Sequence, residues 1–494
     1  MKNFKDFIPL LHAKVDPLLY GVYPLSIHTL KETTLFVAKD KLKKVLVSVG
    51  PSVGLIGSEM TIGEKLVVVG EFDVPNAALL RKLFPFTAPR RVLEKERTIG
   101  VGDRLGIASP GHIRVFKEYD AVPVLAQQSI RELNLTHRTY QDVLDAATYA
   151  VFQEGFKKGY GADGDHLKNE DEVRGALELG YTMITLDCSD HMHNEYELMS
   201  EDDLVSSYVV DKKLEEEYMN KTFTLDNDVS IVFDEIAFKR MVMTYKDVLD
   251  AASFIYTTFF LDDTYHADLE ISIDETTTTT TIQEHFFIAR ELTRRGVEFA
   301  TLAPRFCGEF QKGVDYIGDV AQFEKELIVH SAIARHFNYK LSLHSGSDKF
   351  KIFEIFGRIT KGKFHVKTAG TNYLEAMRLV AMKDPSLYRE IHEFALSAFD
   401  EVTQYYHVST DITRIPSLKE LEDDDLVRLF EHNDSRQLIH ITYGPILNKK
   451  KADGSYLFKD RLYELWSMYE DLYSDLLFRH IKRHLYQLYR NMKG

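Results

Sequence analysis

The sequence contains few cysteines and no long apolar run. Only Cys188 and Cys307 occur among 494 residues, so a disulfide framework is excluded and a reducing, cytoplasmic location is expected. No stretch approaches the roughly 20 consecutive apolar residues that a membrane span requires. The first residues include an acid, Asp6, and few apolar side chains, which is unlike a secretory signal. We therefore expect no membrane partner.

Positive charge is also in short supply. The chain has 61 Lys and Arg against 76 Asp and Glu, a net charge of −15, which argues against nucleic-acid partners and anionic membrane surfaces. Nucleotide motifs are missing too. The glycines at 100, 102 and 106 precede an expected strand instead of following one, and no phosphate-binding loop occurs. Neither NAD nor ATP is expected as a cofactor.

Apolar residues, at 44 %, are sufficient for a large core, and they follow a repeating order of strand and amphipathic helix. Thr139 and Asp142 mark one helix start, Asn169 and Glu172 another, and a third helix is expected over 319–338. Eight strands alternate with such helices, which predicts a (β/α)8 TIM barrel of the α/β class. The expected strands are 105–109, 122–127, 161–167, 181–187, 269–274, 298–303, 340–344 and 364–367.

Three segments differ in pattern. Residues 1–98 indicate an N-terminal α/β extension, and residues 99–383 the catalytic barrel. The barrel carries an acidic insertion at 194–265, between the fourth and fifth expected strands. Residues 384–494 are expected to be mainly helical, ending in a long helix with an apolar stripe from Leu462 to Leu477.

Polar side chains gather where these strands end, which is where the catalytic groups of a barrel lie. Asp165 and His166 end the third strand, His344 the seventh, and Glu309 follows the sixth. A single Asp-His pair is more often a turn cap beside a core histidine. Together, however, the imidazoles of His166 and His344 and the carboxylate of Glu309 favour a site for one divalent cation, Zn²⁺, Mn²⁺, Co²⁺ or Fe²⁺. The polar residues 190–193 are better interpreted as a solvated loop.

Two motifs carry a family resemblance. Gly-Ala-Asp-Gly-Asp-His at 161–166, followed by a helix and a strand ending at Asp187, resembles the class II ketose aldolases, in which an Asp-His pair supplies a proton-transfer acid and a metal ligand. His-Ser-Gly-Ser at 344–347 resembles their later metal segment, although Glu309 stands where a second metal histidine is expected. Further segments make the chain similar to the tagaturonate epimerase family along most of its length: 127–131, 274–276, 303–306 and 313–318.

The resemblance implies an isomerase that interconverts the ketohexuronates D-tagaturonate and D-fructuronate and needs a divalent metal. The inverted carbon lies two bonds from the ketone, so simple enolisation does not acidify its hydrogen. We therefore expect retro-aldol cleavage to a metal-stabilised enediolate, followed by aldol addition to the other face of the aldehyde. Asp165 would accept one proton and Glu275 would donate on the opposite face, with Asp274 and Glu270 as alternatives to Glu275.

A small ketohexuronate also requires groups that bind its carboxylate. The candidates are Gln128, Ser129, Arg305, Lys349, Lys367 and Thr368. Two other functions stay open, a class II-type ketose aldolase and a non-catalytic aldolase-like subunit. Self-association into a homo-oligomer is open as well.

Overall fold

The computed structural model describes residues 2–225, 229–262, 264–276, 278–404, 406 and 408–492. The chain packs into two compact units, each assembled from separate stretches of sequence. Unit 1 comprises Met1–Pro89, Val101–Ala162 and Ala369–Arg483. Unit 2 comprises Arg90–Gly100, Asp163–Thr368 and His484–Gly494.

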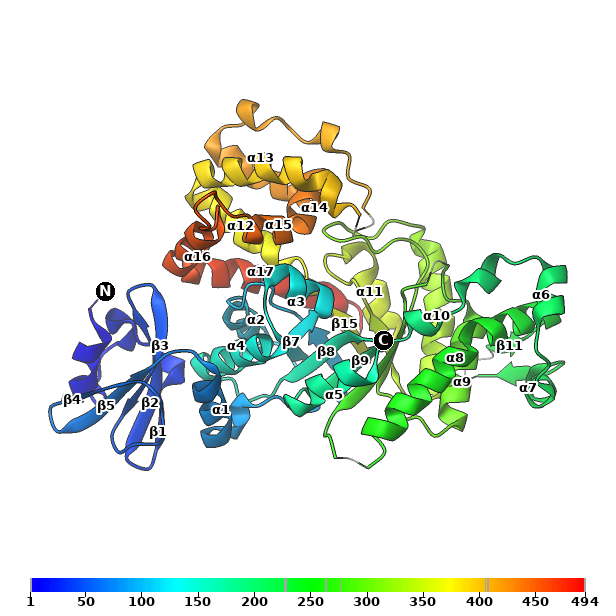
Figure 1. Cartoon of the computed structure of the whole chain (residues 1–494), viewed down its shortest axis with the longest axis horizontal. Coiled ribbons are helices and arrows are strands. Elements are labelled where there is room, and N and C mark those ends of the chain that lie inside the picture. The colour runs from blue at the N-terminus through cyan, green and yellow to red at the C-terminus, as the bar shows by residue number, and fades with distance from the viewer. Residues whose placement is uncertain are drawn as a thin grey trace. The chain divides into compact units, whose positions relative to one another are not determined.

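Eight parallel strands close into a barrel, and they follow one another around it in chain order, β6-β7-β8-β9-β12-β13-β14-β15. Figure 1 labels four of them, β7, β8, β9 and β15. The predicted (β/α)8 barrel is confirmed. Parallel neighbours need crossover connections, and helices supply them. The strands are β6 (Arg97–Gly100), β7 (Val122–Ser129), β8 (Gly161–Leu167), β9 (Met183–Asp187), β12 (Asp268–Ile273), β13 (Thr301–Pro304), β14 (Lys340–Leu343) and β15 (Phe364–Lys367).

The first barrel strand was predicted at 105–109, and this prediction is wrong. The strand is β6, eight residues earlier, and it pairs with β15 from Phe364↔Arg97 to Lys367↔Gly100. In the predicted segment, the backbone amides donate hydrogen bonds to the Asp103 carboxylate instead of to a neighbouring strand. Its Oδ1 accepts hydrogen bonds from the amides of Leu105 (3.1 Å) and Gly106 (2.8 Å), and its Oδ2 accepts from Ala108 (2.7 Å). The segment is therefore a turn that leads into a helix.

The helices of the barrel layer begin where the sequence indicates. Thr139 forms a capping box with Asp142 at the start of α4, and the Asn169 side chain accepts from the Glu172 amide at the start of α5. Helix α10 covers most of the predicted 319–338 segment. The helices in and around the barrel are α2 (Ser109–Phe116), α3 (Ile130–Thr136), α4 (Tyr140–Gln153), α5 (Glu170–Glu178), α9 (Ile282–Arg294), α10 (Val320–His336) and α11 (Phe350–Ile359).

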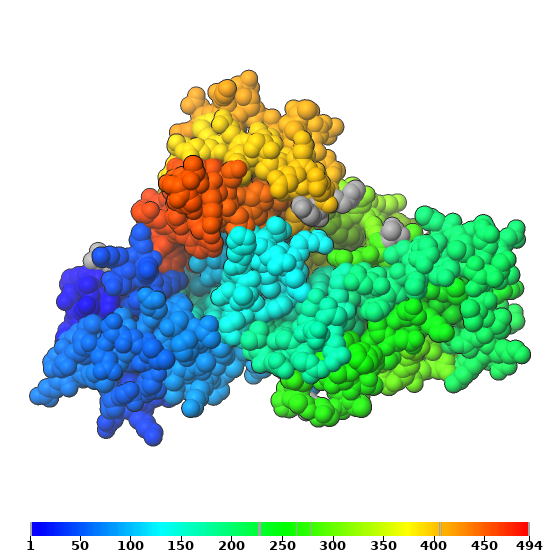
Figure 2. Space-filling model, in the orientation of Figure 1, coloured from blue at the N-terminus to red at the C-terminus, as the bar shows by residue number. Residues whose placement is uncertain are grey.

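The insertion after β9 has its own structure. It comprises α6 (Glu201–Ser207), α7 (Lys212–Tyr218), a hairpin of β10 (Thr222–Thr224) and β11 (Ser230–Val232), and the long helix α8 (Glu235–Phe259). Aromatic residues fix it to the outer helix α9: Tyr218 meets Phe287 at 5.3 Å between ring centroids, and Phe223 meets Phe286 at 4.9 Å. Its residues form part of the surface drawn in green in Figure 2.

Unit 1 combines a sheet with a helical region. The sheet has the order β1-β2-β3-β5-β4, and the predicted helical C-terminal region is present. The expected last helix is in fact two, α16 and α17, which meet at Tyr469. None of the helices in the described ranges is long and apolar enough to cross a membrane. The elements are β1 (His28–Leu30), β2 (Thr33–Asp40), β3 (Lys43–Val49), β4 (Ser58–Ile62), β5 (Lys65–Gly70), α1 (Val74–Leu83), α12 (Asn372–Lys383), α13 (Pro385–Val402), α14 (Asn433–Ile441), α15 (Tyr443–Asn448), α16 (Lys459–Met468) and most of α17 (Glu470–Tyr489).

Two helical glycines of unit 2 have opposite surroundings. Gly357 in α11 is buried, and a Cβ there would overlap the carbonyl oxygen of Leu488 near the end of α17. Gly175 in α5 has open space where its Cβ would be. Close backbone approach therefore requires glycine at 357 but not at 175.

We predict that Gly357→Ala lowers the free energy of unfolding by about 1–3 kcal/mol, because the methyl group displaces the end of α17. Gly175→Ala is the matched control, and it should raise stability by about 0.5–1 kcal/mol by restricting the unfolded chain. Thermal or denaturant unfolding of the two variants measures both effects. A Gly357→Ala variant as stable as Gly175→Ala would contradict the close packing.

Candidate metal centre

A buried lysine binds three carboxylates of the barrel strands in unit 2. The Lys367 Nζ, at the end of β15, lies 2.8 Å from Asp163, 2.7 Å from Asp165 and 3.0 Å from Glu270. Burial alone would lower the pKa of Lys367, but the three carboxylates raise it well above its usual value. Lys367 is therefore a fixed cation. It was predicted to bind substrate, but the structure commits its ammonium to protein carboxylates.

A local irregularity of the backbone brings the side chains of Asp165 and His166 into contact. In a regular strand, successive side chains point to opposite faces. Here β8 has an irregular register between Gly164 and Leu167, and His166 adopts φ 58°, the left-handed region. This bulge lets the His166 Nδ1 lie 2.8 Å from the Asp165 carboxylate.

His344 is held between two other carboxylates. Its Nε2 lies 2.7 Å from Glu270 and its Nδ1 lies 3.0 Å from Asp274. Burial alone would lower the pKa of His344, but Asp274 and Glu270 outweigh it and raise the pKa to about 10. These surroundings therefore favour the charged form of the imidazole. The site has an electrostatic preference for positive charge at the position between His344 and Asp274.

Three of these side chains could hold a metal ion. Ligand atoms of His166, Asp274 and His344 lie within 4.8 Å of one another, and the two imidazole rings are 5.0 Å apart between centroids. Each histidine uses its other nitrogen on a carboxylate, His166 on Asp165 and His344 on Glu270. Such outer carboxylates orient histidine ligands in metal sites. Two imidazoles and one carboxylate suit Zn²⁺, Mn²⁺, Co²⁺ and Fe²⁺.

The charge balance also fits a cation. Asp163, Asp165, Glu270 and Asp274 supply four carboxylates against the single ammonium of Lys367. Burial raises the pKa of Asp163 to about 6, although Lys367 opposes this. For Asp165, burial raises the pKa, but Lys367 and His166 outweigh it and hold the pKa well below its usual value. The cluster thus keeps an excess of negative charge that a divalent cation would balance.

Glu309, the predicted third ligand, does not belong to this group of three. It is exposed, its backbone pairs with Ile317, and its carboxylate accepts a hydrogen bond of 2.6 Å from the Gln311 side chain. Glu309 lies five positions beyond the end of β13, so the strand does not determine the direction of its side chain. Asp274, directly after β12, is the third member of the group in place of Glu309.

Other predicted residues have different environments. Glu275 is exposed, whereas its two alternatives, Glu270 and Asp274, are in the cluster. Arg305 is half-buried, and its amide donates to the Thr280 hydroxyl at 2.9 Å. In the loop at 190–193, which was predicted to be solvated, His193 is half-buried and pairs with Asp247 at 2.8 Å.

Most of the remaining predicted substrate ligands have structural partners. The buried Lys349 ammonium donates to the carbonyl oxygens of Gln311 (3.0 Å), Val314 (2.7 Å) and Ser347 (2.9 Å), which argues against substrate contact. The Thr368 hydroxyl donates to Gly100 O at 2.8 Å. In unit 1, Ser129 caps α3.

Gln128 is the exception among these residues. It is fully buried and donates to Gln127 O at 2.8 Å, but its Oε1 has no hydrogen-bond partner in the described part of the chain. A buried amide oxygen without a donor is costly, so this atom is suited to a ligand or an ordered water.

Sequence reasoning missed Asp163 and Thr185. The Thr185 hydroxyl donates to Asp163 (2.9 Å) and lies 3.1 Å from Glu270, and Thr301 donates to Glu270 at 2.6 Å. Strand alternation was the available signal, because Asp163 shares the face of Asp165, and Glu270 the face of Asp274.

Comparison with known proteins identifies the family. A sequence profile described as UxaE, tagaturonate epimerase, matches residues 23–488. The chain belongs to the tagaturonate epimerase family. Its sequence is 40% identical over 472 residues to the tagaturonate/fructuronate epimerase of Thermotoga maritima, covering 94% of this chain and 96% of that protein.

Crystal structures of another family member superimpose closely. The fructuronate-tagaturonate epimerase UxaE from Cohnella laeviribosi, in a complex with one glycerol, is 46% identical with a TM-score of 0.93, covering 98% of this chain and 99% of that one. Its native form gives a TM-score of 0.92 over 97% of each chain. The barrel and its additions are thus those of a tagaturonate epimerase.

We predict that Lys367→Met lowers the free energy of unfolding by about 3–5 kcal/mol, because it leaves buried carboxylates without their cation. The loss should shrink as pH falls, since protonated carboxyl groups need no counter-ion. Lys363→Met, at an exposed neighbouring position, is the control and should change little. Unfolding curves at several pH values test this. Equal stability of the two variants would contradict the counter-ion role.

Proposed function

We propose that this protein interconverts D-tagaturonate and D-fructuronate at a single divalent metal ion. The observation that carries the proposal is the convergence of His166, Asp274 and His344 in a member of the tagaturonate epimerase family. The named relatives supply the substrate pair, since both are described as epimerases of these two ketohexuronates.

His166, Asp274 and His344 would hold the metal, and Asp165 and Glu270 would orient the two imidazoles from behind. A divalent cation bound there would polarise the substrate ketone and stabilise negative charge on the neighbouring oxygen. Glu309, which belonged to the ligand set expected from the sequence, is left outside it in this proposal.

The route that we propose is cleavage and re-formation of a carbon–carbon bond. The inverted carbon lies two bonds from the ketone, so removing its hydrogen gives no stabilised anion. A retro-aldol step instead turns that carbon into an aldehyde, which can rotate and accept the bond on its other face. The hydroxyl proton must leave during cleavage and return during addition, so an acid/base group is needed near each face.

Asp165 is the acid/base group on one face. Lys367 and His166 keep its carboxylate ionised but lower its pKa, so it can hold the hydroxyl proton only while one of these two contacts is released. Glu275 remains the proposed donor on the second face, because it is exposed and directly follows the ligand Asp274. For the substrate carboxylate, Arg305 is the proposed partner. Among the described residues its guanidinium has no ion pair, while its backbone is fixed by Thr280.

The purified protein is predicted to interconvert the two ketohexuronates, to lose this activity in EDTA, and to regain it with Mn²⁺, Zn²⁺ or Co²⁺. Isomer analysis together with elemental analysis of bound metal tests this. Activity that survives complete removal of metal would refute the metal role. Accumulation of free three-carbon fragments would favour the aldolase alternative.

Ligand variants provide the controls. Asp274→Ala and His344→Ala should each lose bound metal, whereas Glu309→Ala should keep it. Asp165→Asn should keep the metal and lose turnover by roughly 10²–10⁴-fold. Because metal content is measured directly, a variant that is merely inactive is distinguished from one that cannot bind the ion.

Isotope labelling separates the two possible routes. We predict that interconversion in D₂O introduces no deuterium at the inverted carbon, because its C–H bond is never broken in the retro-aldol route. NMR or mass spectrometry of the product measures the label. Substantial deuterium at that carbon would rule out cleavage and require proton transfer there.

A further inference from the structure

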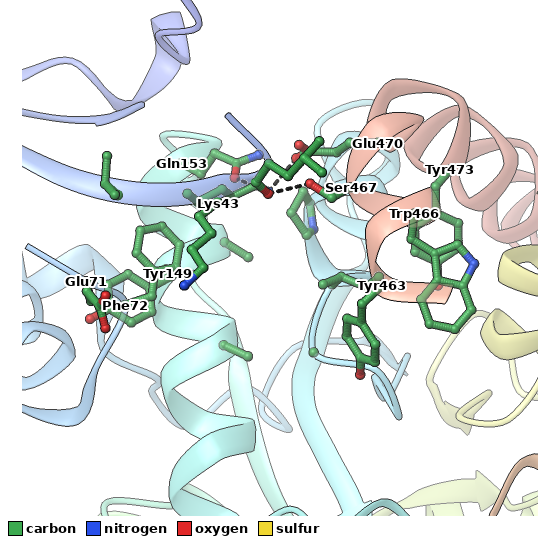
Figure 3. A pocket seen from close by; sticks show the side chains of 18 residues that line it. Lys43, Glu71, Phe72, Tyr149, Gln153, Tyr463, Trp466, Ser467, Glu470 and Tyr473 are labelled. Atoms are coloured by element: carbon green, nitrogen blue, oxygen red, sulfur yellow. Dashed lines mark hydrogen bonds and ion pairs between the residues drawn. The ribbon is translucent and has the colours of Figure 1, made fainter. Parts of the chain in front are cut away.

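Unit 1 contains a cavity that is lined by five segments of the chain. Its walls come from the start of β3, from Glu71 and Phe72, from the turn and helix start at 106–110, from the face of α4 between Ala146 and Gln153, and from α16 and the first turn of α17 (Figure 3). Its volume is about 410 Å³, at the lower end of the range of small-molecule pockets. Nothing in the proposed epimerase chemistry uses it.

Aromatic rings form two of the walls. Phe72 and Tyr149 stack with centroids 3.9 Å apart, and Tyr463 and Trp466 meet edge to face at 5.2 Å. The polar atoms of the second pair are occupied elsewhere: the Trp466 indole donates to Ala376 O (2.9 Å) and the Tyr463 hydroxyl to Leu105 O (2.8 Å). The rings are therefore fixed in place, and they offer apolar surface to a flat ligand.

One end of the cavity is polar but already satisfied. The Glu470 carboxylate accepts a hydrogen bond of 2.7 Å from Tyr23 and is paired with Lys44. Lys44 also donates to the Gln153 side chain at 2.7 Å. A ligand gains nothing by placing a charge at this end.

Lys43 is different. In Figure 3 its side chain extends from β3 into the cavity alongside Tyr149. Within the described part of the chain, no hydrogen bond or ion pair involves its ammonium. A cation at the edge of an aromatic cavity is suited to a carboxylate whose ring lies deeper.

We propose that this cavity binds a small aromatic carboxylate, with its ring between the Phe72–Tyr149 and Tyr463–Trp466 pairs and its carboxylate on Lys43. The ligand class follows from these two features together, since apolar rings alone would select no charge. Binding should also hold the wall segments together.

The experiment uses a built-in signal. Trp466 is the only tryptophan of the chain, so fluorescence excited at a wavelength that tryptophan absorbs and the 26 tyrosines do not reports on this cavity. Phenylpropionate is the probe. Phenylethylamine has the same ring with the opposite charge, and cyclohexylpropionate has the same charge without the aromatic ring. We expect a saturable change with phenylpropionate, and binding roughly five- to tenfold weaker with each comparator.

Variants of exposed lysines decide the role of charge. Lys43→Ala should abolish the preference for phenylpropionate over phenylethylamine, whereas Lys65→Ala, on the same sheet but outside the cavity, should leave it intact. Ala146→Phe should fill the cavity and weaken binding, with circular dichroism as a check on folding.

The proposal is wrong if phenylpropionate gives no saturable change, or if Lys43→Ala binds it as the unaltered protein does. Binding is measured without a metal or a ketohexuronate. Its failure therefore does not bear on the proposed epimerase, and failure of the epimerase does not bear on it.

Discussion

The buried ammonium of Lys367 makes the rest of the site feasible. Two strands, β8 and β12, bring Asp163, Asp165 and Glu270 to within about 3 Å of its nitrogen. Without a cation, carboxylates packed this closely in a barrel interior would have to protonate. One fixed charge therefore allows the barrel to keep acidic groups ionised beside the two histidines. Lys367, which was predicted to bind substrate, is thus the counter-ion of these three carboxylates.

The histidines show how the same carboxylates shape the candidate centre. Glu270 contacts Nε2 of His344 and leaves Nδ1 facing Asp274. Asp165 contacts Nδ1 of His166 and leaves its Nε2 available to a metal ion. Asp274 and Glu270 raise the pKa of His344, so this environment favours positive charge. A metal ion would replace the proton of the charged imidazole and satisfy the same electrostatic demand without a rearrangement of the ligands.

Much of this arrangement can be predicted from sequence, and the failures have physical reasons. Strand 161–167 and the pairing of His166 with His344 follow from the periodic pattern. Strand β6 is only four residues long and half polar, so the turn organised by Asp103 looked more like a strand. The register of β12 decides between Asp274 and Glu275, and one residue of slip reverses the choice. Glu309 lies in a loop, where periodicity gives no information.

The division into two units has a further consequence. The chain passes from one unit to the other five times, after residues 89, 100, 162, 368 and 483. No contiguous gene fragment can therefore encode either unit, and neither can be exchanged between relatives as a cassette. The two units must therefore fold together. The helix α17 is divided between them. Neither unit is complete without its part of that helix, so the folding of each depends on the segment that contains α17.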